Sequence, residues 1–226
     1  MGVTPSHLDA LDLTAEGFSA GSASTGDQPS GESISAARLR HNPPRQARKA
    51  FLRGFNAHRA GDYQAAAEAF EKTIAIDPEF SEAHGDLGVE YTWTGRLADS
   101  VSEFQRALQL DPATALHHTN FSYTLILLKR YSEAEAEAQT AVGLDPADGV
   151  AHFLLGWLLA RRPETRPLSE NHLLYAARTI PEAHLALAQL YGIQGASQVA
   201  DTEVKRYRQA TALNTQHRNA VTGFLP

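Results

Sequence analysis

The sequence predicts an all-α solenoid built from about five helix-turn-helix repeats, and three observations support this fold class. An Asp-Pro dipeptide recurs at intervals of 34 residues, with its prolines at Pro78, Pro112 and Pro146. A small residue recurs in one column of the same repeat, at Gly54, Gly88, Ser122, Gly156 and Ala188. Apolar residues between these markers follow helical spacing, and no segment is a convincing strand. Repeats of about 20 to 50 residues are typical of solenoid proteins.

The stretch from Ser81 to Pro112 indicates how one repeat folds. Leu87, Gly88 and Tyr91 share one face of the first helix, where the small Gly88 lets a second helix approach closely. Gly95 ends this first helix, because glycine readily adopts the backbone conformation of a helix C-terminus. The second helix covers about residues 98–110 and buries Val101, Phe104, Ala107 and Leu108. One helix pair has too little core to fold alone, so stacked pairs are expected to share a continuous core.

These features resemble the tetratricopeptide repeat family. The resemblance covers residues 44 to about 214 and depends on Leu87-Gly88, Tyr91, Gly95, Phe104, Ala107 and Pro112, with equivalents in the neighbouring copies. It implies a right-handed superhelical solenoid in which the first helix of each pair lines a concave groove. The groove of this family takes extended peptides or partner helices. The resemblance therefore implies a scaffold or adaptor for protein–protein recognition.

Five helix pairs are expected in order along the chain. The first three are Pro44 to Pro78, Ser81 to Pro112 and Ala115 to Pro146. Pro44 can begin the first helix, because proline is tolerated in a first helical turn. The fourth pair begins at Gly149 and ends at Pro181, with an irregular turn that contains two prolines. The fifth pair begins directly afterwards, and its long second helix is expected over about residues 196–213.

The repeat domain is expected over residues 44–214, between two tails. Residues 1–43 are expected to form a disordered acidic tail and an extended linker, because Gly, Ser, Thr and Pro crowd residues 19–30 and large apolar residues are few. Residues 34–39 could lie extended over the groove or against a neighbouring helix. Residues 215–226 are expected to form a C-terminal tail.

The composition excludes several classes of protein. The chain has no cysteine, which excludes disulfides, thiolate zinc sites and cysteine nucleophiles. With 42% hydrophobic and 20% charged residues, it is expected to be globular and soluble. No apolar run approaches the roughly 18 residues that a membrane-spanning helix needs. No signal peptide is visible, which favours a cytoplasmic location.

No catalytic arrangement, cofactor or metal is expected, so the chain is not predicted to be an enzyme. No glycine-rich phosphate loop follows a strand, and the carboxylates are scattered. One column holds a histidine in four repeats, at His84, His118, His152 and His184. Packed helices lie roughly 8–10 Å apart, whereas zinc ligands lie about 2 Å from the metal. These histidines are therefore expected to form a ladder of packing residues and not a metal cage.

The candidate binding site is the groove that the family resemblance implies. Its columns hold Phe51, Phe55, His58, Arg59, Val89, Thr92, Trp93, Asn120, Tyr123, Phe153, Trp157 and Arg161. Aromatic and arginine side chains are typical anchors of binding surfaces. The sequence leaves open, residue by residue, whether each binds a partner or packs in the core. One subclass of the family binds C-terminal carboxylates through Lys, Asn and Arg, but only Asn120 matches that pattern, so this mode is not expected.

A second candidate surface lies on the first helix. The net charge is −6, yet the acidic N-terminal segment is followed by a basic helix face made of Arg45, Arg48, Lys49, Arg53 and Arg59. Such a face could bind anionic lipid or nucleic acid. The alternative is a solvated cap that pairs with the acidic tail. A protein or peptide partner is favoured, nucleic acid is not expected, and the oligomeric state stays open.

Overall fold

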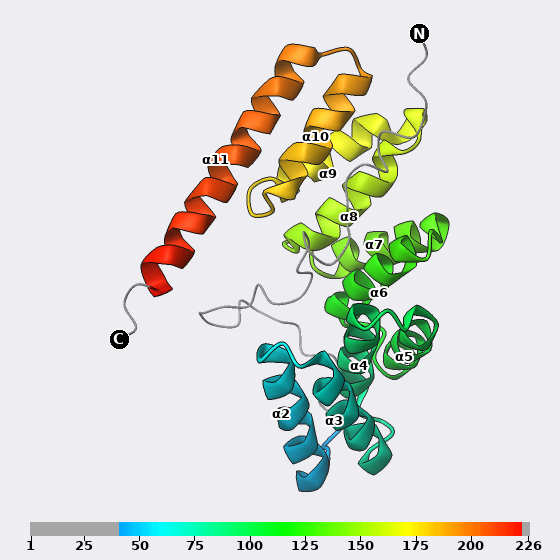
Figure 1. Cartoon of the computed structure of the whole chain (residues 1–226). Coiled ribbons are helices and arrows are strands. Elements are labelled where there is room, and N and C mark those ends of the chain that lie inside the picture. Colours follow the sequence, from blue (N-terminus) through cyan, green and yellow to red (C-terminus); the bar gives the residue numbers. More distant parts are fainter. Residues whose placement is uncertain (1–40, 223–226) are drawn as a thin grey trace. The chain divides into compact units, whose positions relative to one another are not determined.

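The computed structural model describes residues 41–222, and side-chain positions are considered up to residue 212. Within that range the chain contains ten α-helices, one short 3-10 helix and no strand. The helices, labelled from α2 in Figure 1, form antiparallel pairs. The all-α class and the helix pairs that the sequence predicted are confirmed. The described residues divide into two compact units, 41–146 and 147–222, and each is considered by itself.

The unit of residues 41–146 contains three helix pairs at the predicted positions. They are α2 (Arg45–Arg59) with α3 (Tyr63–Ile76), α4 (Ser81–Trp93) with α5 (Leu97–Leu110), and α6 (Ala115–Leu127) with α7 (Tyr131–Leu144). Each helix packs against its partner in the pair, and successive pairs of this unit pack through α3 with α4 and α5 with α6. The sequence predicts that Pro44 begins the first helix, whereas Pro44 occupies the N-cap position and α2 begins one residue later at Arg45.

Glycine ends the first helix of the first two pairs in this unit. Gly61 and Gly95 follow α2 and α4 with φ angles of 77° and 78°, a left-handed conformation that costs glycine little. The equivalent position after α6 holds Lys129, which has a φ of 59°. Among the described residues, it is the only non-glycine residue with a positive φ. The third turn therefore keeps the shape of the other two although its sequence lacks the glycine.

The repeated Asp-Pro dipeptide marks the connection between pairs. Asp111 is buried, and one of its carboxylate oxygens accepts a hydrogen bond from the Thr114 hydroxyl at 2.9 Å. The other oxygen accepts from the Ala113 backbone N–H at 3.2 Å. Asp77 accepts from the Glu79 backbone N–H in the same manner. The aspartate therefore folds the linking turn, and the proline that follows prevents the helix from continuing.

Small residues allow the two helices of a pair to touch. A Cβ atom added to Gly54 would lie 2.6 Å from the Phe70 ring, and one added to Gly88 would lie 3.1 Å from the Phe104 ring. A Cβ atom added to Gly156 in the other unit would lie 2.8 Å from Leu173. The prediction that these three glycines lie at helix–helix contacts is confirmed.

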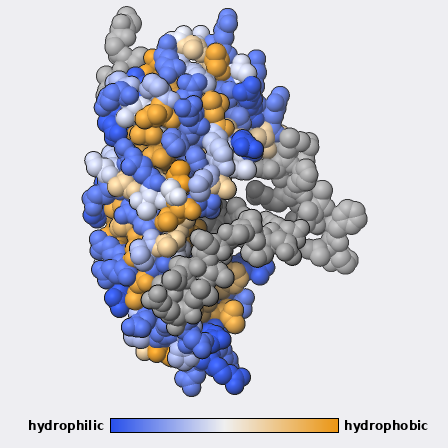
Figure 2. Space-filling view, turned by 180° about the vertical axis from the view of Figure 1, so that it is seen from behind, coloured by the Kyte–Doolittle hydropathy of each residue, from blue (hydrophilic) through white to orange (hydrophobic). Residues whose placement is uncertain are grey.

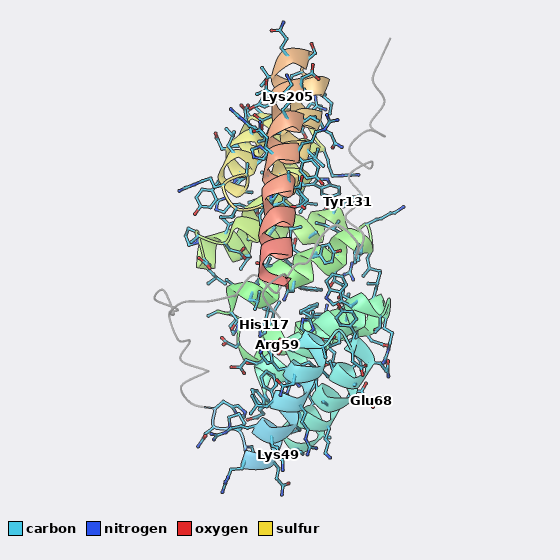
Figure 3. The ribbon with its side chains drawn as sticks, turned by 60° about the vertical axis from the view of Figure 1, so that its left-hand side comes forward. Lys49, Arg59, Glu68, His117, Tyr131 and Lys205 are labelled. Atoms are coloured by element: carbon cyan, nitrogen blue, oxygen red, sulfur yellow. The ribbon has the colours of Figure 1, made fainter. Side chains whose placement is uncertain are left out.

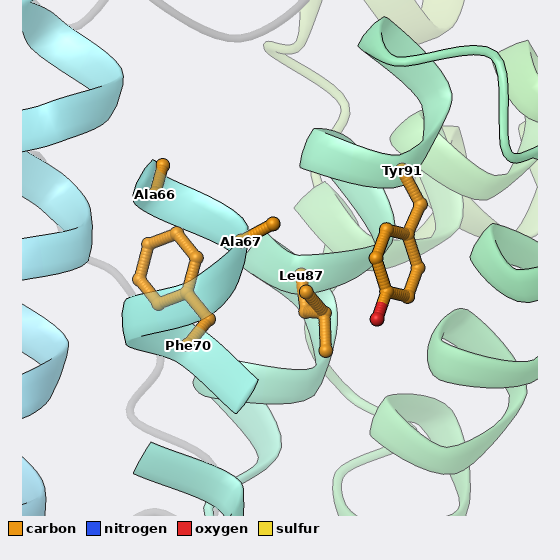
Figure 4. Packing of buried hydrophobic residues seen from close by; sticks show 5 residues of the cluster. All are labelled: Ala66, Ala67, Phe70, Leu87 and Tyr91. Atoms are coloured by element: carbon orange, nitrogen blue, oxygen red, sulfur yellow. The ribbon is translucent and has the colours of Figure 1, made fainter. Parts of the chain in front are cut away.

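The core continues from one pair to the next, as Figure 4 shows for the first two pairs. Ala66, Ala67 and Phe70 of α3 form one buried cluster with Leu87 and Tyr91 of α4. Since α3 and α4 belong to different repeats, this cluster holds the repeats together. Burial of apolar surface between neighbouring repeats is the main source of stability in such arrays.

The unit of residues 147–222 contains two further pairs. Their helices are α8 (Gly149–Ala160), the 3-10 helix η2 (Pro163–Thr165), α9 (Arg166–Ala176), α10 (Glu182–Ile193) and α11 (Ser197–Thr222). The irregular turn predicted in the fourth repeat contains the 3-10 helix η2. The last helix extends beyond Leu213, because the sequence contains neither glycine nor proline from there to Gly223. None of the helices in the described range is long and apolar enough to span a bilayer.

The predictions for residues 1–40 lie outside the described residues. They concern the disordered acidic tail and the extended segment at residues 34–39.

Candidate functional site

Five of the predicted groove residues line one small pocket in the unit of residues 41–146. The pocket, called here the α4–α6 pocket, is lined by Val89, Thr92, Trp93, Phe104, Asn120 and Tyr123. Its volume is about 10 Å³, roughly what a single water molecule requires. It is thus far smaller than the roughly 300–1,000 Å³ of small-molecule sites.

The helical register explains why these residues meet. Val89, Thr92 and Trp93 share one face of α4, because residues three and four apart on a helix are neighbours. On α6, Tyr123 occupies the position equivalent to Val89, and Asn120 occupies the position equivalent to Asp86, one turn before Val89. The Thr92 hydroxyl lies 2.8 Å from both the Ser100 and the Thr124 hydroxyls. This network joins α4, α5 and α6, so Thr92 fixes the pocket wall.

Trp93 forms the aromatic wall of the pocket with a partner that the sequence did not single out. Its ring stacks on Tyr63 of α3, with ring centres 5.8 Å apart and planes 15° apart. Tyr63 also contacts the ring of His58. Trp93 is partly exposed and Tyr63 is 37% exposed, whereas Asn120 and Tyr123 are buried. The surface open to a partner is therefore mainly that of Val89, Trp93 and Tyr63.

The four predicted residues of α2 have different environments. Phe51 stacks on Phe80 at 4.9 Å between ring centres and packs against the buried core, so it is mainly a core residue. Phe55 is 46% exposed. His58 is half-buried and contacts Glu90 of α4. Arg59, labelled in Figure 3, is exposed and is the last residue of α2. Only Phe55 and Arg59 of this group offer large exposed side chains.

The three predicted residues of the fourth repeat lie in the other unit. Phe153 is fully buried and Trp157 is 3% exposed. The Arg161 guanidinium lies over the Trp157 ring, 5.0 Å from its centre. Phe153 and Trp157 therefore present almost no surface to a partner. Both side chains pack in the core of their unit, which leaves them little surface for the binding role that the sequence predicts.

The histidine column forms bonds within each repeat. Three of these histidines contact a glutamate on the second helix of their own pair: His84 with Glu103 at 2.7 Å, His118 with Glu137 at 2.6 Å, and His184 with Glu203 at 2.7 Å. In the fourth repeat, His152 instead contacts His172 at 2.9 Å. Among residues 41–222, no three His, Asp or Glu side chains are placed to hold a metal ion. In these four pairs the column ties the two helices together.

A row of carboxylates also lies on the first helix of the second repeat. Glu82, Asp86 and Glu90 are four residues apart and share one face of α4. Glu90 is 1% exposed, and one of its oxygens lies 2.6 Å from His58 Nδ1. This hydrogen bond to Glu90 raises the pKa of His58. Burial, with the nearby charge of Glu90, raises the pKa of Asp86 to about 7.

Comparison with protein-family models identifies the repeat. Residues 57–119 match one model described as a tetratricopeptide repeat, and residues 118–148 match a second with the same description. Together these matches cover residues 57–148, which include helices α3 to α7, the Gly88 contact and the α4–α6 pocket. The chain contains tetratricopeptide repeats.

Solved tetratricopeptide repeat structures share its fold. MamA from Desulfovibrio magneticus aligns with a TM-score of 0.64 and 18% identity, over 74% of this chain and 96% of that chain. A thermophilic repeat protein of Thermus thermophilus aligns with a TM-score of 0.60 and 22% identity, over 79% and 100%. YrrB, described as having an unusual peptide-binding site, aligns with a TM-score of 0.59 and 16% identity, over 71% and 84%. No curated protein sequence matches the chain.

Sequence reasoning about this tetratricopeptide repeat missed two features of the site. Tyr63 lies on a second helix, whereas the family resemblance directed attention to first helices. Asp86 and Glu90 were counted among scattered carboxylates. Their spacing of four residues, continued by Glu82, was the signal that could have placed them on one helix face.

Proposed function

We propose that the chain is a protein-interaction scaffold that binds a peptide or helix of a partner protein at the α4–α6 pocket. The observation that carries this proposal is the convergence of Val89, Trp93, Asn120 and Tyr123 from two successive first helices. The partly exposed Trp93 and Tyr63 rings lie beside the α4–α6 pocket and form the kind of surface on which a partner side chain can anchor.

Exposed apolar residues extend this surface beyond the pocket. Leu52 and Phe55 lie three residues apart on α2 and are 59% and 46% exposed. On the face drawn in Figure 2, apolar residues likewise lie in patches separated by hydrophilic ones. The fold is also one on which YrrB carries a peptide-binding site. These features support recognition of a segment with a few apolar anchors.

The test compares Trp93→Ala with Trp157→Ala in the full chain. The test peptide is one selected from a display library for binding to the full chain. Trp93 is partly exposed, so its removal is expected to weaken binding of this peptide by about 2 kcal/mol or more, with a limited change in melting temperature. Trp157 is buried, so its removal is expected to cost about 3–5 kcal/mol of stability. Binding would be measured by calorimetry and stability by thermal melting.

A matched control is Leu168→Ala, which removes an exposed apolar side chain of α9. It is expected to change neither binding nor melting. Unchanged affinity in Trp93→Ala would place the binding surface elsewhere and contradict the proposal.

The basic face of α2 supports a second candidate function, peripheral binding to an anionic surface. Its five basic residues, Arg45, Arg48, Lys49, Arg53 and Arg59, are all exposed. Within the described chain none of them forms an ion pair with a carboxylate. Clustered cations without acidic partners attract lipid or nucleic-acid phosphates. Salt dependence separates this candidate from the pocket and is treated in the Discussion.

A further inference from the structure

The least expected feature of the unit of residues 41–146 is a buried carboxylate that lacks a full set of partners. Glu90 is 1% exposed, and its Oε1 atom contacts His58. Its Oε2 atom is also buried and has no hydrogen-bond partner among the described residues. A buried charged group that is left unsatisfied destabilises a fold. Such a group is therefore unusual in a position that only serves packing.

Asp86 adds a second negative charge one helical turn away on the same face of α4. It keeps part of its surface exposed, in contrast with Glu90. The only described base that acts on it electrostatically is His58, whereas Glu82 and Glu90 both act against its ionisation. Two carboxylates thus share one face of α4, and one imidazole, hydrogen-bonded to Glu90, lies near them. The pair has more negative charge than its surroundings neutralise.

The position of this pair relates it to the α4–α6 pocket. Asp86 and Glu90 alternate with Val89 and Trp93 on α4, so the acidic and the aromatic side chains are neighbours on one helix. Trp93 and Tyr63 provide ring faces, which attract cations. A basic side chain could lay its apolar stem on the aromatic wall and place its charged end at Asp86.

We propose that the Asp86–Glu90 pair binds a basic side chain, arginine or lysine, of the partner peptide that occupies the α4–α6 pocket. This inference rests on the proposed function and names the class of partner that the site takes. Asp86, being partly exposed, makes the direct contact with the cation, and Glu90 strengthens the negative potential behind it. Charge complementarity of this kind selects partners by rejecting acidic segments.

Peptide selection provides the first test. A random peptide display library would be panned against the full chain, and the most enriched peptide would be synthesised. Its basic residue would also be replaced by a neutral analogue, citrulline for arginine or norleucine for lysine. The expected result is enrichment of arginine or lysine together with an apolar residue. The neutral analogue should bind at least about tenfold more weakly, as expected for a lost charged hydrogen bond.

Variants of the chain provide the second test. Asp86→Asn is expected to lower the affinity for the selected peptide by at least about tenfold. Glu90→Gln should lower the affinity less, because Asp86 and not Glu90 makes the direct contact with the cation. The glutamine also keeps an oxygen that can accept the His58 hydrogen bond. Glu68→Gln is the matched control, since Glu68 is an exposed carboxylate on α3, labelled in Figure 3. It should leave the affinity unchanged, and thermal melting should show all three variants folded.

Proton release provides a readout that a structural role alone would not change. Because Asp86 is only partly ionised near neutral pH, a bound cation should drive a proton from it. Calorimetry at about pH 7 in two buffers of different ionisation enthalpy would measure this release. Release is expected for the wild-type chain and should disappear in Asp86→Asn.

The outcomes distinguish this inference from the proposed function. Peptides that depend on Trp93 but carry no basic residue, and that bind Asp86→Asn normally, would overturn the inference and leave the proposed function standing. Failure to select any peptide would overturn both. A dimer in ultracentrifugation that Asp86→Asn dissociates would identify a second copy of the chain as the occupant and would overturn the peptide assignment.

Discussion

At the scale of single residues, two glycines within helices show what packing adds to helix propensity. A Cβ atom at Gly88 would press on the Phe104 ring, whereas one at Gly143 would meet nothing within 4 Å. Gly88→Leu is therefore expected to destabilise the chain by about 1–3 kcal/mol through overpacking. Gly143→Ala is expected to stabilise it by roughly 0.5–1 kcal/mol, because glycine loses more freedom on folding. Urea unfolding followed by circular dichroism measures both, and equal effects would contradict the packing argument.

Lys129 gives a second prediction at this scale. Its φ of 59° is a conformation that glycine adopts at the equivalent Gly95. A left-handed backbone costs a non-glycine residue about 1–2 kcal/mol. Glycine avoids this cost, but it loses more conformational freedom on folding, which offsets part of the gain. Lys129→Gly should therefore raise stability, by at most about 1 kcal/mol. Lys49→Gly, the same substitution within α2, should instead lower it by about 1 kcal/mol. Destabilisation by both substitutions would show that the turn is not strained.

The sequence placed the site residues in register but could not state their exposure. Phe51 and Phe55 are one turn apart and equally aromatic, yet the first packs on Phe70 and Phe80 and the second is exposed. The difference arises from which side of α2 meets α3 and α4. A repeat pattern predicts the position of each residue within its helix. Its burial depends on the particular residues that the neighbouring helices place beside it.

At the scale of helix pairs, the histidine–glutamate contact predicts a pH dependence of stability. His118 Nδ1 lies 2.6 Å from a Glu137 oxygen, and its Nε2 lies 3.0 Å from the Pro112 carbonyl oxygen. Since the carbonyl oxygen can only accept, and an ionised carboxylate does the same, the protonated ring satisfies both contacts. Burial acts to lower the pKa of His118, but the hydrogen bonds to Glu137 and Pro112 outweigh it and raise the pKa above 6.5.

The stability from this contact is fully present below the unfolded-state pKa of about 6.5 and is lost as pH rises through the raised folded-state pKa. His118→Gln is therefore expected to cost about 1.5–3 kcal/mol at roughly pH 6, the range for a hydrogen bond to a charged group. The cost should shrink by about pH 9. Urea unfolding of both chains across this range gives the difference. Asp99→Asn, an exposed change on α5, is the control and should show no trend in this window.

The order of helices was predictable because glycine and proline interrupt the helical pattern at fixed intervals. Gly95 and Pro112 bound the two helices of the second repeat, and the structure ends α4 and α5 beside them. Where such residues are missing, the sequence predicted less well. The end of α11 was placed near Leu213, whereas the helix continues to Thr222.

At the scale of the whole molecule, the division into two units predicts that residues 41–146 can act alone. This unit contains three repeats with their own core, the α4–α6 pocket and the Asp86–Glu90 pair. Repeats contact mainly their neighbours, and three are enough for a stable array. A fragment of residues 41–146 is expected to be helical, to unfold cooperatively and to bind the selected peptide like the full chain. An unfolded fragment, or one that binds only when residues 147–226 are added, would contradict this prediction.

The distribution of charge over the chain gives the last prediction, which separates the pocket from the basic face of α2. The net charge is −6, and the exposed basic residues of α2 are the region most suited to an anionic surface. Charge-driven binding weakens steeply with salt, whereas a partly buried contact is screened much less. If the pocket is the binding site, Arg45→Glu combined with Lys49→Glu should leave the peptide affinity unchanged, and raising the salt from about 50 to 500 mM should weaken peptide binding only modestly.

The same double variant and the wild-type chain would be mixed with phosphatidylserine vesicles and sedimented. One result would move the functional surface from α4 and α6 to α2. In that result the wild-type chain binds the vesicles, this binding is lost both in high salt and in the double variant, and the double variant also loses peptide binding.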